Sequence, residues 1–242
     1  GRAALHVLFD YSSKGDEEAS LPWAVEEALG FFLELLPILP DKEVYLDRRV
    51  RRPLLIWTDA SYEAKKEPPG ALGLVVFDTE SDRWYHASGV ISKEWLSRLA
   101  EKQTYIGQLE VLAAVAAYFS LPPKVVRGRD VIHFIDNTGA LTALSKGYSC
   151  DVDSARMAHA FHILNAAVQA NVWFNYVPSG ANISGLPSRD GVEECKRIIR
   201  DLFDSESEEI EMVLPPLGSL ADMVRSLRRT TSGGGGKRQR TR

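Results

Sequence analysis

Blocks of apolar and polar residues alternate through the middle of the chain, and their period predicts strands and helices in a regular order. Between residues 53 and 177, five short apolar runs are rich in β-branched and aromatic residues and are bounded by turn residues, as strands are. The predicted strands are Leu54–Asp59, Ala71–Phe77, Arg83–Val90, Val131–Asp136 and Val172–Val177. Because only short turns separate the first three, we expect these to be antiparallel neighbours.

Helical spacing of apolar residues fills the longer intervals between and after these strands. In Ile106–Phe119 the apolar residues recur at three- and four-residue intervals until Pro122 and Pro123 end the pattern. The other predicted helical segments are Ser92–Leu99 (one turn), Thr138–Leu144, Ser154–Ala170 (with Ser154 as its cap) and Val192–Phe203. Strands that neighbour one another, followed by alternating helices and strands, predict a mixed α/β layer structure.

The regions on either side of this pattern differ from it, so we divide the chain into residues 1–52, 53–203 and 204–242. In the first part, a short apolar run and a polar loop at 12–20 lead to one amphipathic helix, which starts at Leu21 and ends at Pro37. We expect this helix to pack on the central domain, and the alternative is that it is the last helix of an upstream domain. The basic stretch Asp47–Arg52 is predicted to be a linker.

The third part changes character along its length. It is acidic at 205–211 and continues into Val213–Leu217, whose two prolines suit docking in an extended form. A flexible glycine-rich linker then leads to a basic end at Lys237–Arg242. We expect a disordered tail at this end, with a nuclear address or a nucleic-acid contact as the alternative.

Composition and charge narrow the class of protein only moderately. A hydrophobic content of 45% and a charged content of 26% are ordinary for a soluble globular protein, and the net charge of −4 gives no overall basic field for nucleic acid. Cys150 and Cys195 are far apart and lack metal-ligand spacing, so we expect a reducing, intracellular compartment, either nucleus or cytoplasm. No apolar stretch is long enough to span a bilayer, and no signal peptide is visible at the start, so no membrane partner is expected.

Three carboxylates occupy places in this pattern where a charge is costly. Asp59 and Asp136 come at the ends of predicted strands, and Glu110 lies inside an apolar helical segment. A carboxylate in such a setting needs a cation, a hydrogen-bond donor or water. Acids on a strand end, a helix and a second strand end suggest a metal site, although solvated strand ends and an exposed helix face remain the alternatives.

Four segments around these acids resemble, in order and spacing, the motifs of a ribonuclease H domain. They are Trp57–Ser61, Gly107–Glu110, Phe134–Asn137 and Val177–Arg189. The likeness is greatest to the domain fused to reverse transcriptases of eukaryotic retroelements, to which Lys146–Ser149, Asp153–Arg156 and Val172–Phe174 are also similar. The resemblance spans residues 53 to 203, and the part before residue 50 resembles the connection between polymerase and nuclease.

The resemblance implies a ribonuclease H-like fold, with a five-stranded mixed sheet of three antiparallel and two parallel strands and helices on both faces. It implies hydrolysis of the RNA strand of RNA–DNA hybrids with Mg²⁺, or with Mn²⁺ as an alternative. Asp59 would be shared between two ions, and Glu110 and Asp136 would complete the first ion's site. The implied partners are the hybrid itself and an upstream reverse transcriptase domain or another subunit. Four polar residues are candidates for contacting the hybrid: Ser61, Gln108, Asn137 and Asn182.

The sequence departs from the family pattern at one position. Gly185 stands where the family has a fourth acid, and glycine offers no ligand atom. Asp190 is a weak substitute, and Ser184 is a poor one. Ser179 stands where many cellular relatives have a histidine. Three acids therefore remain to bind metal, and activity is expected to be reduced, Mn²⁺-dependent or absent.

Three functions stay open on these residues. The first is a ribonuclease H enzyme, and the second is a catalytically weak or inactive module that binds a hybrid or a protein partner as a scaffold. The third is a transposase-like nuclease whose last acid would be Glu193 or Glu194 in the final helix. Arg127 and Arg129 precede the fourth strand and are predicted to lie away from Asp136. His159 and His162 are predicted to be packing or surface residues.

Overall fold

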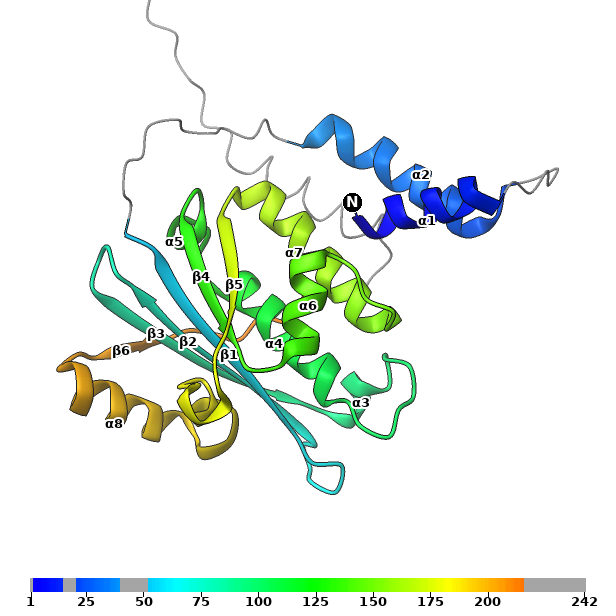
Figure 1. Ribbon diagram of the computed structural model, residues 1–242. Coiled ribbons are helices and arrows are strands. Elements are labelled where there is room, and N and C mark those ends of the chain that lie inside the picture. The colour runs from blue at the N-terminus through cyan, green and yellow to red at the C-terminus, as the bar shows by residue number, and fades with distance from the viewer. Residues whose placement is uncertain (1, 15–20, 40–51, 216–242) are drawn as a thin grey trace, which may run out of the picture.

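A mixed sheet forms the centre of the computed structural model, which describes residues 2–14, 21–39 and 52–215; within these the sheet has six strands (Figure 1). The antiparallel strands are β1 (Leu54–Tyr62), β2 (Gly70–Asp78) and β3 (Arg83–Ile91). Strand β4 (Asp130–Ile135) pairs in parallel with β1, and β5 (Asn171–Tyr176) pairs in parallel with β4. The order β5-β4-β1-β2-β3 confirms the predicted ribonuclease H-like arrangement of three antiparallel and two parallel strands.

A sixth strand, β6 (Ser207–Glu209), lies in the acidic stretch and corrects the expectation of a five-stranded sheet. It pairs in parallel with β3 from Trp84 to His86, and the backbone N–H of Ile210 donates to the carbonyl of His86 at 3.0 Å. The segment Ser-Glu-Glu has little intrinsic strand preference. Backbone groups on the open edge of β3 hold it in place, which a side-chain pattern does not reveal.

Helices cover both faces of the sheet, as predicted. The long ones are α4 (Ile106–Ser120), α6 (Thr138–Lys146), α7 (Val152–Val168) and α8 (Val192–Phe203); the short ones are α3 (Lys93–Leu96), α5 (Pro123–Val126), η2 (Ser179–Ala181) and the π-helical turn η3 (Leu186–Asp190). Helices α4, α6 and α7 lie on one face and α8 on the other (Figure 1). Alternate residues of β2 show this division, because Leu74 and Val76 face the larger core whereas Val75 packs with Ile199 of α8.

The start of α7 differs from the prediction. The helix begins at Val152, and its cap is Asp151 rather than Ser154. The Asp151 carboxylate accepts hydrogen bonds from both the backbone N–H of Ser154, at 2.8 Å, and its hydroxyl, at 2.7 Å. An aspartate three residues before the predicted cap is an equally good capping residue.

Two helices, not one, occupy the described part of residues 1–52. They are α1 (Arg2–Lys14) and α2 (Trp23–Leu35), and the 3-10 turn η1 (Leu36–Ile38) follows α2. The Phe31 ring of α2 is buried and meets the His159 ring of α7 edge-on, with centroids 4.8 Å apart. This contact agrees with the expectation that the helix after Leu21 packs on the central domain.

Some predicted segments fall outside the described residues. These are the basic linker before Arg52 and the part of the tail after residue 215, including its glycine-rich and basic segments. The described start of the Val213–Leu217 segment contacts the end of α4, where the Val213 N–H donates to the Ser120 hydroxyl at 2.8 Å. None of the helices within the described ranges has the length and apolar character that crossing a membrane requires.

Candidate metal centre

Asp59 lies within a strand of the sheet, which corrects the prediction that it comes at the end of a strand. Strand β1 continues to Tyr62, and the Asp59 residue is only 1% exposed. Its partner across the antiparallel pair is Gly73. A Cβ atom at Gly73 would lie 2.1 Å from the Ser184 carbonyl, so only glycine lets the loop at 184–188 approach the sheet beside Asp59.

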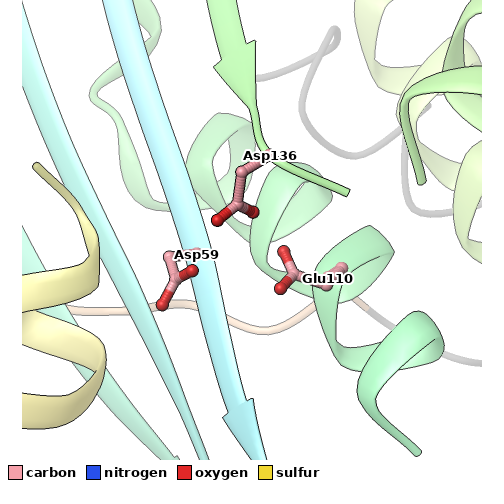
Figure 2. A group of neighbouring side chains, drawn as sticks. All are labelled: Asp59, Glu110 and Asp136. Carbon is pink, nitrogen blue, oxygen red and sulfur yellow. The ribbon is translucent and has the colours of Figure 1, made fainter. Parts of the chain in front are cut away.

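The pairing of β1 with β4 brings the second aspartate next to the first. Thr58 and Ile135 are partners in the parallel ladder, so the next residues, Asp59 and Asp136, follow at the same level. Glu110 comes from the first half of α4, which packs on β1. Figure 2 shows the three carboxylates pointing toward one another from these elements, and one ligand oxygen from each lies within 4.8 Å of the others.

Burial makes this cluster electrostatically unfavourable without a cation. Burial, together with the negative charges of Asp59 and Asp136, raises the pKa of Glu110 to about 9. Burial also raises the pKa of Asp59, and hydrogen bonds from Ser188 and Arg189 offset that rise only in part. The Glu110 Oε2 atom is buried and has no hydrogen-bond partner among the described residues. If all three acids were ionised, the cluster would hold more negative charge than the surrounding protein neutralises, so without a cation it keeps a proton.

Two residues of the η3 turn hold the Asp59 carboxylate, and sequence reasoning did not single them out. Arg189 donates from Nη2 to Oδ1 at 3.0 Å and from Nε to Oδ2 at 3.3 Å, and the Ser188 hydroxyl donates to Oδ2. In the sequence, only the position of Ser188 and Arg189 at the end of the Val177–Arg189 motif pointed to them. The Arg189 side chain is 49% exposed, so the pair joins a buried acid to a solvent-facing cation.

Gly185 immediately precedes this turn. A Cβ atom at residue 185 would lie 3.2 Å from Nη2 and 3.6 Å from Cζ of Arg189. The guanidinium group therefore lies between residue 185 and Asp59. Ser184 is fully buried, and its hydroxyl donates to Asn182 Oδ1 at 2.6 Å, so it does not replace the missing acid. The side chain of Asp190, the predicted weak substitute, lies outside the described part of the chain.

An open cavity of about 760 Å³ extends from the acids over the turn between β1 and β2. Ser61 and Asn137, two of the predicted substrate contacts, line it. Both side chains also have internal partners, since the Ser61 hydroxyl donates to the Ser188 carbonyl at 2.8 Å and Asn137 accepts from the Ala140 N–H at 3.0 Å as the cap of α6. The cavity also contains Lys66, a cation that the sequence did not indicate.

The positions of Asn182 and Gln108 correct the prediction that these two residues contact the substrate. Asn182 is buried, and its Nδ2 donates to the Thr58 carbonyl at 2.9 Å, so it ties the loop to β1 instead of facing the cavity. Gln108 is buried as well, and its side chain hydrogen-bonds with Asp151. Both amides hydrogen-bond to groups of the protein itself, which is a structural role.

The remaining candidates lie away from the cluster. Glu193 and Glu194 of α8 pair with Lys196 and Arg197, at 2.9 Å and 2.6 Å, and neither glutamate belongs to the three-acid group found among the described residues. This placement argues against the transposase-like function. His159 is buried in packing contacts, as predicted.

Comparisons with known proteins give matches only at the level of structure. No family model matches the chain, and no curated protein matches it. A ribonuclease H1 from the archaeon Halobacterium salinarum is similar over 59% of this chain and 96% of its own, with a TM-score of 0.42 and 16% identity. The N-terminal RNase H domain of a Mycobacterium tuberculosis protein, solved as a fusion with maltose binding protein, is similar over 60% of this chain and 97% of its own, with a TM-score of 0.40 and 12% identity.

Proposed function

We propose that this chain is a metal-dependent nuclease that cuts the RNA strand of RNA–DNA hybrids. The observation that carries the proposal is the meeting of Asp59, Glu110 and Asp136 at one open cavity, with a buried Glu110 oxygen that has no partner in the described part of the chain. Structural acids in proteins are normally paired or solvated, so a buried cluster of unneutralised carboxylates is a marker of function.

The donor set fits a hard divalent cation. All three groups are carboxylates, the ligands that Mg²⁺ and Mn²⁺ prefer, and the open cavity leaves room for water and a substrate phosphate. Asp59, Glu110 and Asp136 would hold the ion. When bound, a divalent cation polarises a phosphodiester and lowers the pKa of an attacking water.

The protein's own contribution is orientation and charge. Ser188 and Arg189 fix the rotamer of Asp59, and α4 holds Glu110 in a largely buried position at the wall of the cavity. Lys66 at the cavity adds positive charge where the phosphate backbone of a hybrid would pass, although Glu63 partly neutralises it. Asn137 and Ser61 line the same path, within reach of the hybrid backbone or its 2′-hydroxyls.

We further propose that the domain serves a reverse transcriptase of a eukaryotic retroelement. The order of the four motifs from Trp57 to Arg189 supports this context, as does the likeness of the first fifty residues to a connection segment. The natural partner would then be an upstream polymerase domain, on the same chain or on another subunit. Helix α2, which packs on α7 through Phe31, and α1, which packs on α2, would lie toward that partner.

Two residues favour a second function, in which the domain binds hybrids without cutting them. Gly185 supplies no ligand, and Arg189 already neutralises part of the charge of Asp59. A site with less negative charge holds a metal ion more weakly. Such a domain would act as a scaffold for nucleic acid or for a protein partner.

Cleavage of an end-labelled RNA–DNA hybrid tests the two functions against each other. We expect the native chain to cut the RNA strand in Mg²⁺ or Mn²⁺ but not in EDTA, and Asp59→Asn to lower the rate roughly 100-fold or more because a metal ligand is lost. Asp201→Asn, which changes an exposed acid on α8, is the matched control and should cut at the native rate.

The outcome also depends on the substrate. Double-stranded DNA and double-stranded RNA of the same sequence should remain intact, because only a hybrid has 2′-hydroxyls on one strand. Salt-dependent binding of the hybrid with no cleavage in either metal would contradict the nuclease and support the scaffold. Equal cleavage by the native chain and Asp59→Asn would point to a contaminating nuclease and would contradict the proposed site.

A further inference from the structure

Both carboxylate oxygens of Asp59 have positively charged or hydroxyl donors on the side of the η3 turn. Arg189 bonds to each oxygen, and Ser188 bonds to Oδ2. Glu110 and Asp136 lie on the other side of Asp59 (Figure 2), and among the described residues no hydrogen bond from a cation or a hydroxyl reaches either carboxylate. A carboxylate has about four acceptor positions, so Asp59 can still bind a cation on the side of the acids.

The guanidinium group lies in the space next to residue 185. Because residue 185 is glycine, no side chain separates the guanidinium from its backbone, and a Cβ atom there would already be 3.2 Å from Nη2. The planar, bidentate geometry is the one in which arginine binds carboxylates most strongly. A second cation beside Asp59 on this side would have to displace Arg189, and it would find no ligand at Gly185.

We propose that Arg189 takes the place of a cation at this site, so that the chain binds one divalent ion, on the side of Glu110 and Asp136, and not two. This inference rests on the proposed function, because it assumes that the acids bind metal. Arg189 is then a positioning residue that limits the number of ions. Gly185 and Arg189 are matched, since a small residue at 185 leaves room for the guanidinium and the guanidinium makes a ligand at 185 unnecessary.

The number of bound ions can be measured without any cleavage reaction. Titration of the purified chain with Mn²⁺, followed by calorimetry and by the electron paramagnetic resonance signal of free Mn²⁺, should give one ion per native chain. The double variant Gly185→Asp with Arg189→Ala should bind two, because it adds a ligand and opens the space beside Asp59. Arg197→Ala on α8, an exposed arginine in an ion pair with Glu194, is the matched control and should bind one.

Arg189→Gln provides a second measurement on a milder variant. Removing a positive charge next to the acids should tighten Mn²⁺ binding about tenfold, while the number of ions stays at one because Gly185 still offers no ligand. If the double variant does not fold, as judged by circular dichroism, this affinity decides the matter. Tenfold tighter binding supports the inference, and unchanged affinity contradicts it.

The outcomes separate this inference from the proposed function. Two ions in the native chain would overturn the role of Arg189 and leave the nuclease standing. One ion in a folded double variant would also overturn it, because the space beside Asp59 would then not be limiting. If neither the native chain nor any variant binds Mn²⁺, both proposals fail.

Discussion

Two aspartates of the central sheet pair with arginines, and the two pairs have opposite characters. Asp78 ends β2 and pairs with Arg129 at 2.7 Å, with both side chains 9% exposed. Asp59 lies within β1 and pairs with Arg189 at 3.0 Å, but there the acid is buried and the arginine is half exposed. The two pairs lie at opposite ends of β4. Arg129 precedes this strand, whereas Asp136, which lies next to Asp59, follows it.

The surroundings of the two acids explain the difference. Asp78 also accepts hydrogen bonds from the Ser81 hydroxyl at 2.7 Å and the Glu80 N–H at 3.1 Å. Burial alone would raise the pKa of Asp78, but these bonds and Arg129 outweigh it and hold the pKa below its usual value. At Asp59 burial prevails, and the nearby Asp136 adds repulsion, so the pKa rises.

An aspartate–arginine pair is therefore not in itself a sign of function. At the Asp78 end the carboxylate has hydrogen-bond donors, and the pair lies at the edge of the sheet where β1 and β4 begin. At the Asp59 end one guanidinium faces three carboxylates, and a buried oxygen of Glu110 has no partner among the described residues. The surplus negative charge, and not the ion pair, distinguishes a site that can recruit a cation.

Removing Arg129 should have the largest effect on stability. Arg129→Ala leaves Asp78 buried without its cation and frees the Arg52 carbonyl, which accepts from Arg129 at 3.0 Å. We expect a loss of about 3 to 5 kcal/mol in the free energy of unfolding, because breaking a buried pair strands a charge. Urea denaturation followed by circular dichroism would measure it.

The same variant should leave the chemistry of the site unchanged. Well below its unfolding temperature, Arg129→Ala should cut a hybrid at the native rate, since the pair is remote from the acids. Arg127→Ala, which changes an exposed neighbour, is the matched control and should change stability by less than about 0.5 kcal/mol. A folded Arg129→Ala that has lost cleavage would contradict the division of the sheet into a structural and a functional end.

Much of this division could be predicted from the sequence. The apolar runs bounded by turns placed β2 and α4 to within one residue of their observed ends. Glu110 stood out because it interrupts an apolar helical pattern, and Asp136 because it ends a buried strand. These signals are local, and local patterns carry most of the information about elements of this kind.

Contacts between distant residues could not be predicted in the same way. Arg189 is 130 positions from Asp59, and no periodicity relates them. The end of β1 was misjudged for the same reason. An acid normally ends a buried run, but hydrogen bonds from Ser188 and Arg189 satisfy the Asp59 carboxylate, so the strand continues to Tyr62. Strand β6 was missed because pairing to the backbone of β3, not its own residues, makes it a strand.

Changing Glu110 to glutamine should have the second largest effect, and in the stabilising direction. Without metal, Glu110→Gln removes one of three clustered acids. The glutamine keeps an oxygen that can accept a hydrogen bond from the Ala60 backbone N–H. Its amide nitrogen can donate a hydrogen bond to Asp59 or Asp136. We expect a gain of about 2 kcal/mol in the free energy of unfolding at pH 7.5 in EDTA. Excess Mg²⁺ should stabilise the native chain and not this variant, because a ligand is lost.

The gain should depend on pH in a defined direction. The pKa of Glu110 rises to about 9 in the folded chain from about 4.5, so the folded state holds the proton more tightly than the unfolded state. The stability that this proton confers is complete below pH 4.5 and is lost as the pH rises toward 9. Glu110→Gln should therefore gain little at pH 4.5 and more at pH 8. A gain that is equal at both values would mean that Glu110 is not buried among charges.

Arg189→Gln should have the smallest effect on stability, and its sign should depend on metal. In EDTA we expect a loss of about 1 kcal/mol, because half of the Arg189 side chain is in solvent and a glutamine can still donate to Asp59. In saturating Mg²⁺ the variant should become slightly more stable than the native chain, since tenfold tighter binding contributes about 1.4 kcal/mol and outweighs the loss. Mg²⁺ should not change the deficit of Arg129→Ala, because the group of three acids that could hold an ion among the described residues does not include Asp78. Thermal unfolding of both variants with and without Mg²⁺ would measure this contrast. Equal rescue of both would show that Mg²⁺ acts on the whole fold, whereas rescue of Arg189→Gln alone would show that a divalent ion and a guanidinium compete to neutralise the same carboxylate.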